Sequence, residues 1–206
     1  MKKLTHHCLS AISILGVIIF LAGCGSKKTV ERIEIDTTID LSGRWNDTDS
    51  RQVSEAIIMD CLNHPWITQH TTRSEGKKPA VIVGAVRNRS TEHIAIGTFI
   101  ADIERAFINS GRVSVVASSN ERGELRAEKE DQSKFASIKT IKEMGRELGA
   151  DYMMTGQINT IEDREGGKQV TFYQTDLTLT NIETNEKVWL GQKKIKKFIK
   201  RKRTTF

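Results

Sequence analysis

Proline, cysteine and long apolar runs are all scarce in this sequence of 206 residues. The apolar run from about Leu9 to Leu21 is too short to span a bilayer, which needs roughly 20 apolar residues. The two prolines are Pro65 and Pro79, so the chain before them contains no stiff, proline-rich spacer. These absences exclude a membrane-spanning helix at the start and a rigid stalk.

The first residues have the order of features found in a secretory signal. A basic start, Met1-Lys2-Lys3, precedes the apolar run. The run ends in Leu21-Ala22-Gly23-Cys24, which resembles the lipobox of bacterial lipoproteins. The resemblance implies that signal peptidase II cuts after Gly23 and that the Cys24 sulfur carries diacylglycerol. The alternatives are an ordinary secretory signal, or a helix that happens to contain cysteine.

The residue after the lipidated cysteine bears on the membrane of residence. It is Gly25, whereas Asp at this position in enteric bacteria resembles an inner-membrane retention signal. We therefore expect an outer-membrane protein that faces the periplasm. Cys8 is lost with the signal and Cys24 is lipidated, which leaves Cys61 alone and excludes an intramolecular disulfide framework. Cys61 is expected to be a small buried hydrophobic residue.

Motifs of catalysis and metal binding are missing. The sequence has no glycine-rich phosphate loop, nucleophile elbow or HExxH helix. His64, His70 and His93 lack metal-ligand spacing, and only Cys61 accompanies them, whereas zinc needs four ligands or three and a water. We expect neither an enzyme nor a bound metal or cofactor.

Basic residues are concentrated at the end of the chain. Residues 193–206 hold eight lysines and arginines and no acid; with these and Lys2 and Lys3 set aside, 22 basic residues remain against 26 acidic ones. The basic stretch has three interpretations: a solvated strand end with a frayed terminus, attraction to anionic lipid headgroups, or nucleic-acid binding. The last is the weakest, because the lipobox places the chain outside the cytoplasm and no aromatic stacking residues accompany the lysines.

Hydrophobic periodicity predicts the elements of the fold. Helices are expected from near Asp47 to before Pro65, from near Thr91 to Asn109, and over a segment carrying Ile138, Ile141 and Leu148. Strands are expected over Ala80–Val86, Val113–Ala117, Tyr152–Ile161, Val170–Ile182 and Lys187 to about Phe198. Residues 69–79 are expected to form a loop and residues 120–134 a solvated helix or loop. This order predicts an α/β, single-domain sandwich, with helices packed on a mixed β-sheet that ends in an antiparallel meander.

Two segments resemble a known family. These are Asp40–Ser50 (DLSGRWNDTDS) and Leu148–Ile158 (LGADYMMTGQI). With the lipobox, they resemble the LpoB-type lipoproteins, which activate penicillin-binding proteins. The second segment is also similar to the amino-terminal domain of TolB and to CsgG-like lipoproteins, so it supports the fold more than the function.

The resemblance implies a domain organisation and a partner. It implies a signal peptide over residues 1–23, a lipidated flexible tether over 24–39, a globular LpoB-like domain over 40–198 and a basic tail over 199–206. The partner would be a class A penicillin-binding protein, whose synthesis of peptidoglycan the domain would stimulate. Known enteric members have a long, proline-rich tether, whereas this one has about fifteen residues and reaches on the order of 50 Å.

Other functions stay open beside this one. A CsgG-like ring pore would need an amphipathic membrane-spanning hairpin, against which the many Thr, Glu and Lys residues of 152–198 argue. A hydrolase of the cell wall is a third alternative. Arg44 and Trp45 are candidate partner-binding residues, because Arg and Trp are enriched at binding hot spots. Alternatively, Trp45 packs on the core while Asn46, Asp47 and Asp49 cap the helix, which accounts for these residue types by itself.

Overall fold

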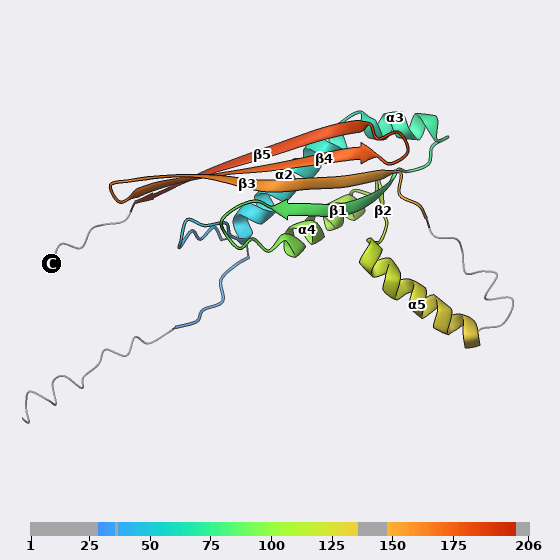
Figure 1. Cartoon of the computed structure of the whole chain (residues 1–206), viewed down its shortest axis with the longest axis horizontal. Coiled ribbons are helices and arrows are strands. Elements are labelled where there is room, and N and C mark those ends of the chain that lie inside the picture. Colours follow the sequence, from blue (N-terminus) through green and yellow to red (C-terminus); the bar gives the residue numbers. More distant parts are fainter. Residues whose placement is uncertain (1–28, 36, 136–147, 201–206) are drawn as a thin grey trace, which may run out of the picture. The chain divides into compact units, whose positions relative to one another are not determined.

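The computed structural model describes residues 29–35, 37–135 and 148–200. The chain divides into two units after Thr37, and all described helices and strands lie in the second unit, Thr38–Phe206. The described helices are α2 (Asp47–Asn63), α3 (Trp66–Arg73), α4 (Ile96–Ser110) and α5 (Ser119–Phe135) (Figure 1). The strands are β1 (Ala80–Asn88), β2 (Ser114–Val115), β3 (Tyr152–Glu165), β4 (Lys168–Asn181) and β5 (Lys187–Lys200).

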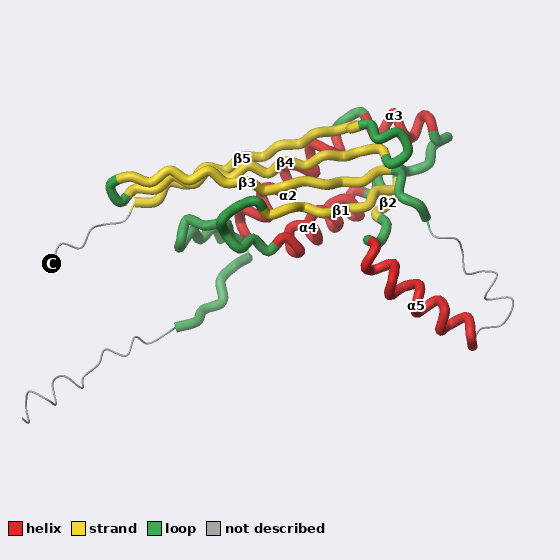
Figure 2. The backbone as a smooth tube through the Cα atoms, viewed as in Figure 1, coloured by secondary structure: helices red, strands yellow, loops and turns green. Residues whose placement is uncertain are grey.

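The strands form one mixed sheet in the order β2-β1-β3-β4-β5 (Figure 2). β1 is parallel to β2 and β3, whereas β3, β4 and β5 form an antiparallel meander. α2 and α4 pack against each other on one face of the sheet, α2 over β5 and α4 over β1 and β2. The predicted α/β fold, with helices on a mixed sheet that ends in a meander, is confirmed.

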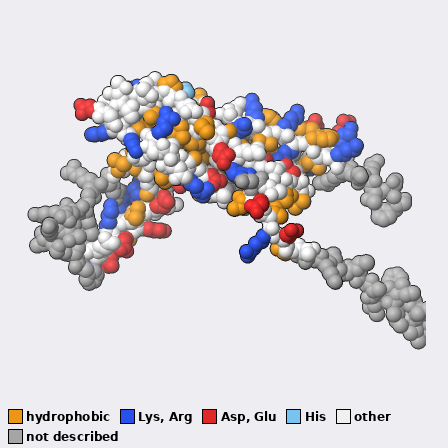
Figure 3. Space-filling view, turned by 180° about the vertical axis from the view of Figure 1, so that it is seen from behind, with side chains coloured by type: hydrophobic (Ala, Val, Ile, Leu, Met, Phe, Trp, Pro, Cys, Tyr) orange, Lys and Arg blue, Asp and Glu red, His pale blue; other side chains and the backbone are white. Residues whose placement is uncertain are grey.

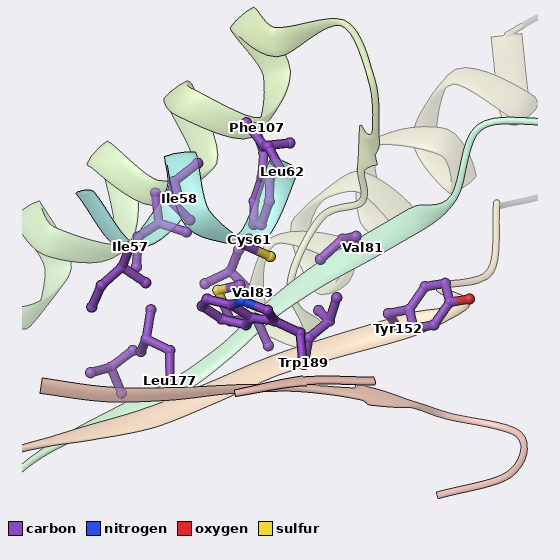
Figure 4. Packing of buried hydrophobic residues seen from close by; sticks show 14 of the residues in the cluster. Ile57, Ile58, Cys61, Leu62, Val81, Val83, Phe107, Tyr152, Leu177 and Trp189 are labelled. Carbon is purple, nitrogen blue, oxygen red and sulfur yellow. The ribbon is translucent and has the colours of Figure 1, made fainter. Parts of the chain in front are cut away.

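The hydrophobic core lies between these two helices and the sheet (Figure 4). Phe99, Ile103 and Phe107, which recur at helical spacing along α4, are all 0% exposed. They meet alternate side chains of β1, β3 and β4, since successive residues of a strand point to opposite faces. Complete burial of a side chain of this size contributes roughly 1.5–3 kcal/mol. The apolar stripe predicted for this helix therefore forms one half of the core.

Cys61 lies inside this core, as expected from its apolar neighbours. Its side chain is 0% exposed, and the indole Nε1 of Trp66 donates a 2.8 Å hydrogen bond to the Cys61 carbonyl oxygen. Burial raises the pKa of the Cys61 thiol from its ordinary value of 9.0 to about 12. The thiol is consequently protonated at neutral pH and is a packing group.

We expect Cys61 to resist thiol reagents while the protein is folded, because the thiolate is the reactive form. In a chain that begins at Gly25, Cys61 is the single thiol. Its labelling by a disulfide reagent near pH 8 should be at least about 100-fold slower in buffer than in denaturant. A thiol whose pKa is raised by folding stabilises the fold fully below pH 9, and this stabilisation is lost as the pH rises toward 12. Fast labelling of the folded protein would contradict the buried position.

The prediction of a loop over residues 69–79 is wrong for its first part. α3 continues to Arg73, and the loop begins only after it. The segment has several threonines, which have low helix propensity. Two features stabilise it instead: Trp66 and Ile67 are buried, and the Thr72 hydroxyl donates a 2.8 Å bond to the Thr68 carbonyl oxygen. Tertiary packing outweighs propensity here.

The second predicted helix begins later than expected. α4 starts at Ile96, not near Thr91, and ends at Ser110; the capping residue after it is Gly111, whose φ of 65° suits glycine. Residues 90–95 stay outside the helix because the Glu92 carboxylate binds groups from other elements. The alternative of a solvated helix over residues 120–134 is confirmed by α5. Of the helix predicted to carry Ile138, Ile141 and Leu148, the first two residues lie outside the described residues. The prediction is wrong for Leu148, which is not helical and is 62% exposed.

The meander is longer than the sequence predicted. β3 and β4 continue to a two-residue turn at Gly166-Gly167, where both residues have positive φ, 53° and 79°. Such a turn matches the twist of two antiparallel strands and needs glycine-like residues. β5 continues to Lys200, two residues past its expected end, whereas β2 is reduced to two residues. The antiparallel strands β3, β4 and β5 therefore extend well beyond the ends of β1 and β2, the strands on which α4 packs.

Candidate docking surface

The residues just before α2 fasten the start of the folded unit to its sheet. Asn46 is the N-cap of α2: its side chain accepts a 3.0 Å bond from the Asp49 N–H, and the Asp49 carboxylate accepts one of 3.0 Å from the Asn46 N–H. This reciprocal pair satisfies two helix-end donors. Trp45 packs half-buried against the core, with its ring edge-on to Tyr173 at 5.5 Å. The interpretation of this segment as a cap with a packing tryptophan is confirmed.

Lys197 of β5 lies beside this segment, although it comes from the far end of the sequence. We call Lys197 and its acceptors Asp40, Asp49 and Arg44 the Lys197 cluster. The Lys197 side chain is 9% exposed, and its ammonium contacts the Asp40 carboxylate at 2.6 Å and the Asp49 carboxylate at 2.5 Å. Its third acceptor, at 2.9 Å, is the Arg44 carbonyl oxygen. Burial disfavours the ammonium, but the hydrogen bonds and charges of the two carboxylates outweigh burial and raise the pKa of Lys197. The interpretation of the whole basic stretch as a solvated strand end is thus wrong for Lys197.

Glu92, in the loop before α4, connects this loop to the residues beside the Lys197 cluster. One carboxylate oxygen accepts a 2.9 Å bond from the Trp45 N–H, and the other accepts a 2.9 Å bond from the Tyr173 hydroxyl. Burial and the neighbouring Glu92 carboxylate raise the pKa of Tyr173 well above its ordinary value, so Tyr173 stays a neutral donor. Sequence reasoning placed Glu92 at a helix start and did not find this role, since the three elements meet only in the folded chain.

The sheet face turned away from α2 and α4 is a candidate surface for a partner, and we call it the open face. Its edge along β5 carries large apolar side chains: Leu190 is 67% exposed and Phe198 is 64% exposed. Ile161 of β3, in the same cross-strand row as Lys196, is 66% exposed. Exposed large apolar groups beside charged ones are typical of binding surfaces.

Polar and basic side chains surround these apolar residues on the open face. At its centre, Gln174 and Gln192 donate amide hydrogen bonds of 2.9 and 2.8 Å to the Asp176 carboxylate. A hollow of about 310 Å³ beside Asp176 is lined by Arg87 and Gln157. Lys194 and Lys196 are exposed along β5. The open face is turned toward the viewer in Figure 1, whereas Figure 3 shows the molecule from behind, with basic and hydrophobic side chains together over the long end of the sheet on that side.

A comparison with models of protein families shows to which family the domain belongs. The model of the family described as peptidoglycan-synthase activator LpoB matches residues 49–195. The chain belongs to the LpoB family. The match begins at the buried Asp49 of α2 and ends at Ile195 in β5. Of the residues that accept from the Lys197 ammonium, it contains Asp49 but not Asp40 or Arg44, and Lys197 itself lies outside it.

Solved structures of LpoB are among those similar to this chain. The LpoB C-terminal domain from Salmonella enterica is 14% identical and covers 71% of this chain and 98% of its own, with a TM-score of 0.40. The NMR structure of Escherichia coli LpoB is 12% identical and covers 88% and 87%, with a TM-score of 0.39. Lipoprotein GNA1162 from Neisseria meningitidis is 12% identical and covers 58% and 83%, with a TM-score of 0.36. A search of curated proteins gives no match. The LpoB assignment rests on the family match.

The site residues predicted from the sequence fall in different places. In this LpoB-family chain, Trp45 is half-buried and occupied by packing, while the side chain of Arg44 is exposed beside it. Leu21, Ala22, Gly23 and Cys24 lie outside the described residues. A role for Arg44 and Trp45 in partner binding stays a prediction. The open face was not found by sequence reasoning; the alternation of Leu190, Lys194 and Lys196 along one strand was its only signal.

Groups with possible catalytic or metal chemistry serve the fold where the structure describes them. His70 lies 3.1 Å from the Tyr152 hydroxyl and 3.7 Å from the Asp151 carboxylate, which itself accepts a 2.8 Å bond from the Ala80 N–H. Among the described residues, no three His, Cys, Asp or Glu side chains form a group that could hold a metal ion. The same part of the chain contains no helix with the length and apolarity needed to cross a membrane.

Proposed function

We propose that this chain is an outer-membrane lipoprotein that binds a class A penicillin-binding protein and stimulates its glycan polymerisation and peptide cross-linking. The observation that carries the proposal is the match of the LpoB family model over residues 49–195. The domain would act by binding, since the family is one of activators and the described clusters of ionisable groups serve the fold. The activated partner would carry out the chemistry.

The anchor in this proposal is the lipid on Cys24. Several acyl chains together hold a protein on a membrane stably, whereas one chain does so only marginally. Gly25 supports the outer membrane as the site of residence, with the domain in the periplasm. The tether that follows would carry the domain toward a synthase in the inner membrane.

The surface proposed to contact the synthase is the open face along β5. Leu190 and Phe198 offer apolar area at the edge of a sheet, flanked by Lys194 and Lys196. Apolar side chains at the centre and charged ones at the rim are the usual anatomy of an interface. Activation then requires that this surface bind the active synthase conformation more tightly than the inactive one. A tenfold stimulation corresponds to a difference of about 1.4 kcal/mol between the two affinities.

The soluble domain is expected to bind a purified class A penicillin-binding protein and to raise its rate of glycan polymerisation. Binding is measured by surface plasmon resonance, and polymerisation by consumption of labelled lipid-linked precursor. The control is the synthase alone at the same detergent concentration. Absence of binding at micromolar concentrations would overturn the proposed function.

A charge at the apolar edge of the open face is expected to weaken this binding. Leu190→Glu and Phe198→Glu should each raise the Kd at least about tenfold, since each replaces an apolar contact of the proposed interface with a charge. Ile108→Glu is the matched control, because Ile108 is 59% exposed on α4, away from the open face. If wild-type binding persists in both β5 variants, the docking surface lies elsewhere on the domain.

A further inference from the structure

The segment Ile39–Arg44, which joins the tether to α2, lies against the folded unit without entering its core; we call it the strap. Leu41 is 94% exposed and Ile39 is 38% exposed, and Arg44 is also exposed. The first residue that packs on the core is Trp45. The strap is therefore held mainly by polar contacts, whereas α2, which follows it, is held by side chains that pack in the core.

Two side chains hold the strap. The Lys197 ammonium binds the Asp40 carboxylate near its start and the Arg44 carbonyl oxygen at its end, at 2.6 and 2.9 Å. The Asn46 amide nitrogen donates to the Asp40 carboxylate at 2.7 Å and to the Ile39 carbonyl oxygen at 3.3 Å. Asp40 thus receives hydrogen bonds from both side chains. Its loss would remove two of these four hydrogen bonds at once.

Gly43 adds a steric fit to these polar contacts. Its φ is +69°, and a Cβ at this position would lie 2.4 Å from two carbons of the Ile199 side chain. The backbone of the strap consequently approaches β5 as closely as only glycine allows. This close approach indicates that the strap binds at one defined position beside β5.

Opening of the strap leaves the rest of the fold intact. Asn46 caps α2 through its carboxamide oxygen and binds the strap through its nitrogen, so the cap does not depend on the strap. Lys197 keeps its 2.5 Å contact with the buried Asp49 when Asp40 departs. A segment with few buried apolar contacts and exposed polar ones is among the parts of a protein that open locally at a low free-energy cost.

We propose that the strap is a releasable latch that sets the length of the tether. Closed, it fixes the point at which the tether leaves the domain beside β5; open, it adds residues 40–44 to the tether, or roughly 17 Å of reach at ~3.3–3.6 Å per residue. Tension between a lipid at Cys24 and a bound partner would favour the open state. The consequence for reach rests on the proposed function, whereas the latch itself is a property of the isolated domain.

Trypsin reports on the latch because Arg44 ends the strap. In the soluble chain beginning at Gly25, cleavage after Arg32 in the tether is the reference for an exposed site, and cleavage after Arg51 in α2 reports unfolding of the domain. Asp40→Ala and Gly43→Ala are each expected to speed cleavage after Arg44 at least about tenfold, because cleavage follows the population of the open form. Neither variant should change the rate at Arg32 or expose Arg51.

Glu34→Gln is the matched control, since it removes an acid from the tether without touching Lys197, and it should leave the Arg44 site protected. Wild-type cleavage after Arg44 as fast as after Arg32 would show that the strap is open already and would overturn the latch. Protection of Arg44 that survives both Asp40→Ala and Gly43→Ala would overturn it as well. Because no synthase is present, either result leaves the proposed function untouched, just as failure of synthase binding would leave the latch standing.

Discussion

Lys197→Met is expected to lower the free energy of unfolding by about 3–5 kcal/mol, because it leaves a buried carboxylate without its partner. Asp49 is 5% exposed and loses the ammonium at 2.5 Å, although it keeps the hydrogen bond from the Asn46 N–H. Methionine fills a similar volume, so the loss is chiefly electrostatic. Since whole domains are stable by about 5–15 kcal/mol, this single change would remove a large fraction of the stability.

Urea unfolding followed by circular dichroism measures this loss, with Lys196→Met as the matched control. Lys196 is the preceding residue, but it is exposed on the open face, and its replacement should change stability by less than about 0.5 kcal/mol. The pH adds a second signature. The pKa of Lys197 is raised in the fold, so its stabilisation is fully present below its ordinary value of 10.5 and is lost as the pH rises through the folded value. Equal stabilities of the two variants would contradict the buried ion cluster.

Cys24→Ser is expected to abolish lipid attachment altogether. In the proposed anchor the thiolate of Cys24 would be the nucleophile that accepts the diacylglyceryl group, whereas a serine hydroxyl is not ionised at neutral pH. Without that group the precursor is not a substrate for signal peptidase II, so residues 1–23 should stay on the chain. Metabolic labelling with a palmitate analogue and intact mass measurement follow both consequences in the same cells.

Cys8→Ser is the control for this experiment, because Cys8 precedes the apolar run and would be removed with the proposed signal. That variant should keep the label and the mass of the mature lipoprotein. Palmitate that remains on the Cys24→Ser chain would place the lipid elsewhere and would remove the anchor from the proposed function. Loss of label in both variants would point to a general export defect, which cell fractionation detects.

Most of the fold was predictable because its elements are marked by local sequence patterns. The stripe of α4, the cap before α2 and the glycine turn after β3 each depend on residues close together in the sequence. Predictions failed where distant residues decide the local structure. α3 forms because Trp66 and Ile67 find a core to enter, and α4 starts late because Glu92 is engaged by Trp45 and Tyr173.

The sequence alone determined the features that need no fold: the lipobox at Cys24, the uneven placement of charge and the alternation of helices and strands. The tertiary structure decided what the adjacent lysines Lys196 and Lys197 of the basic stretch do. Neighbours in a strand point to opposite faces, so Lys196 is solvated on the open face, whereas Lys197 is buried between Asp40 and Asp49. No local pattern distinguishes these two residues, because the carboxylates that bind Lys197 lie about 150 residues earlier and meet it only across the folded sheet.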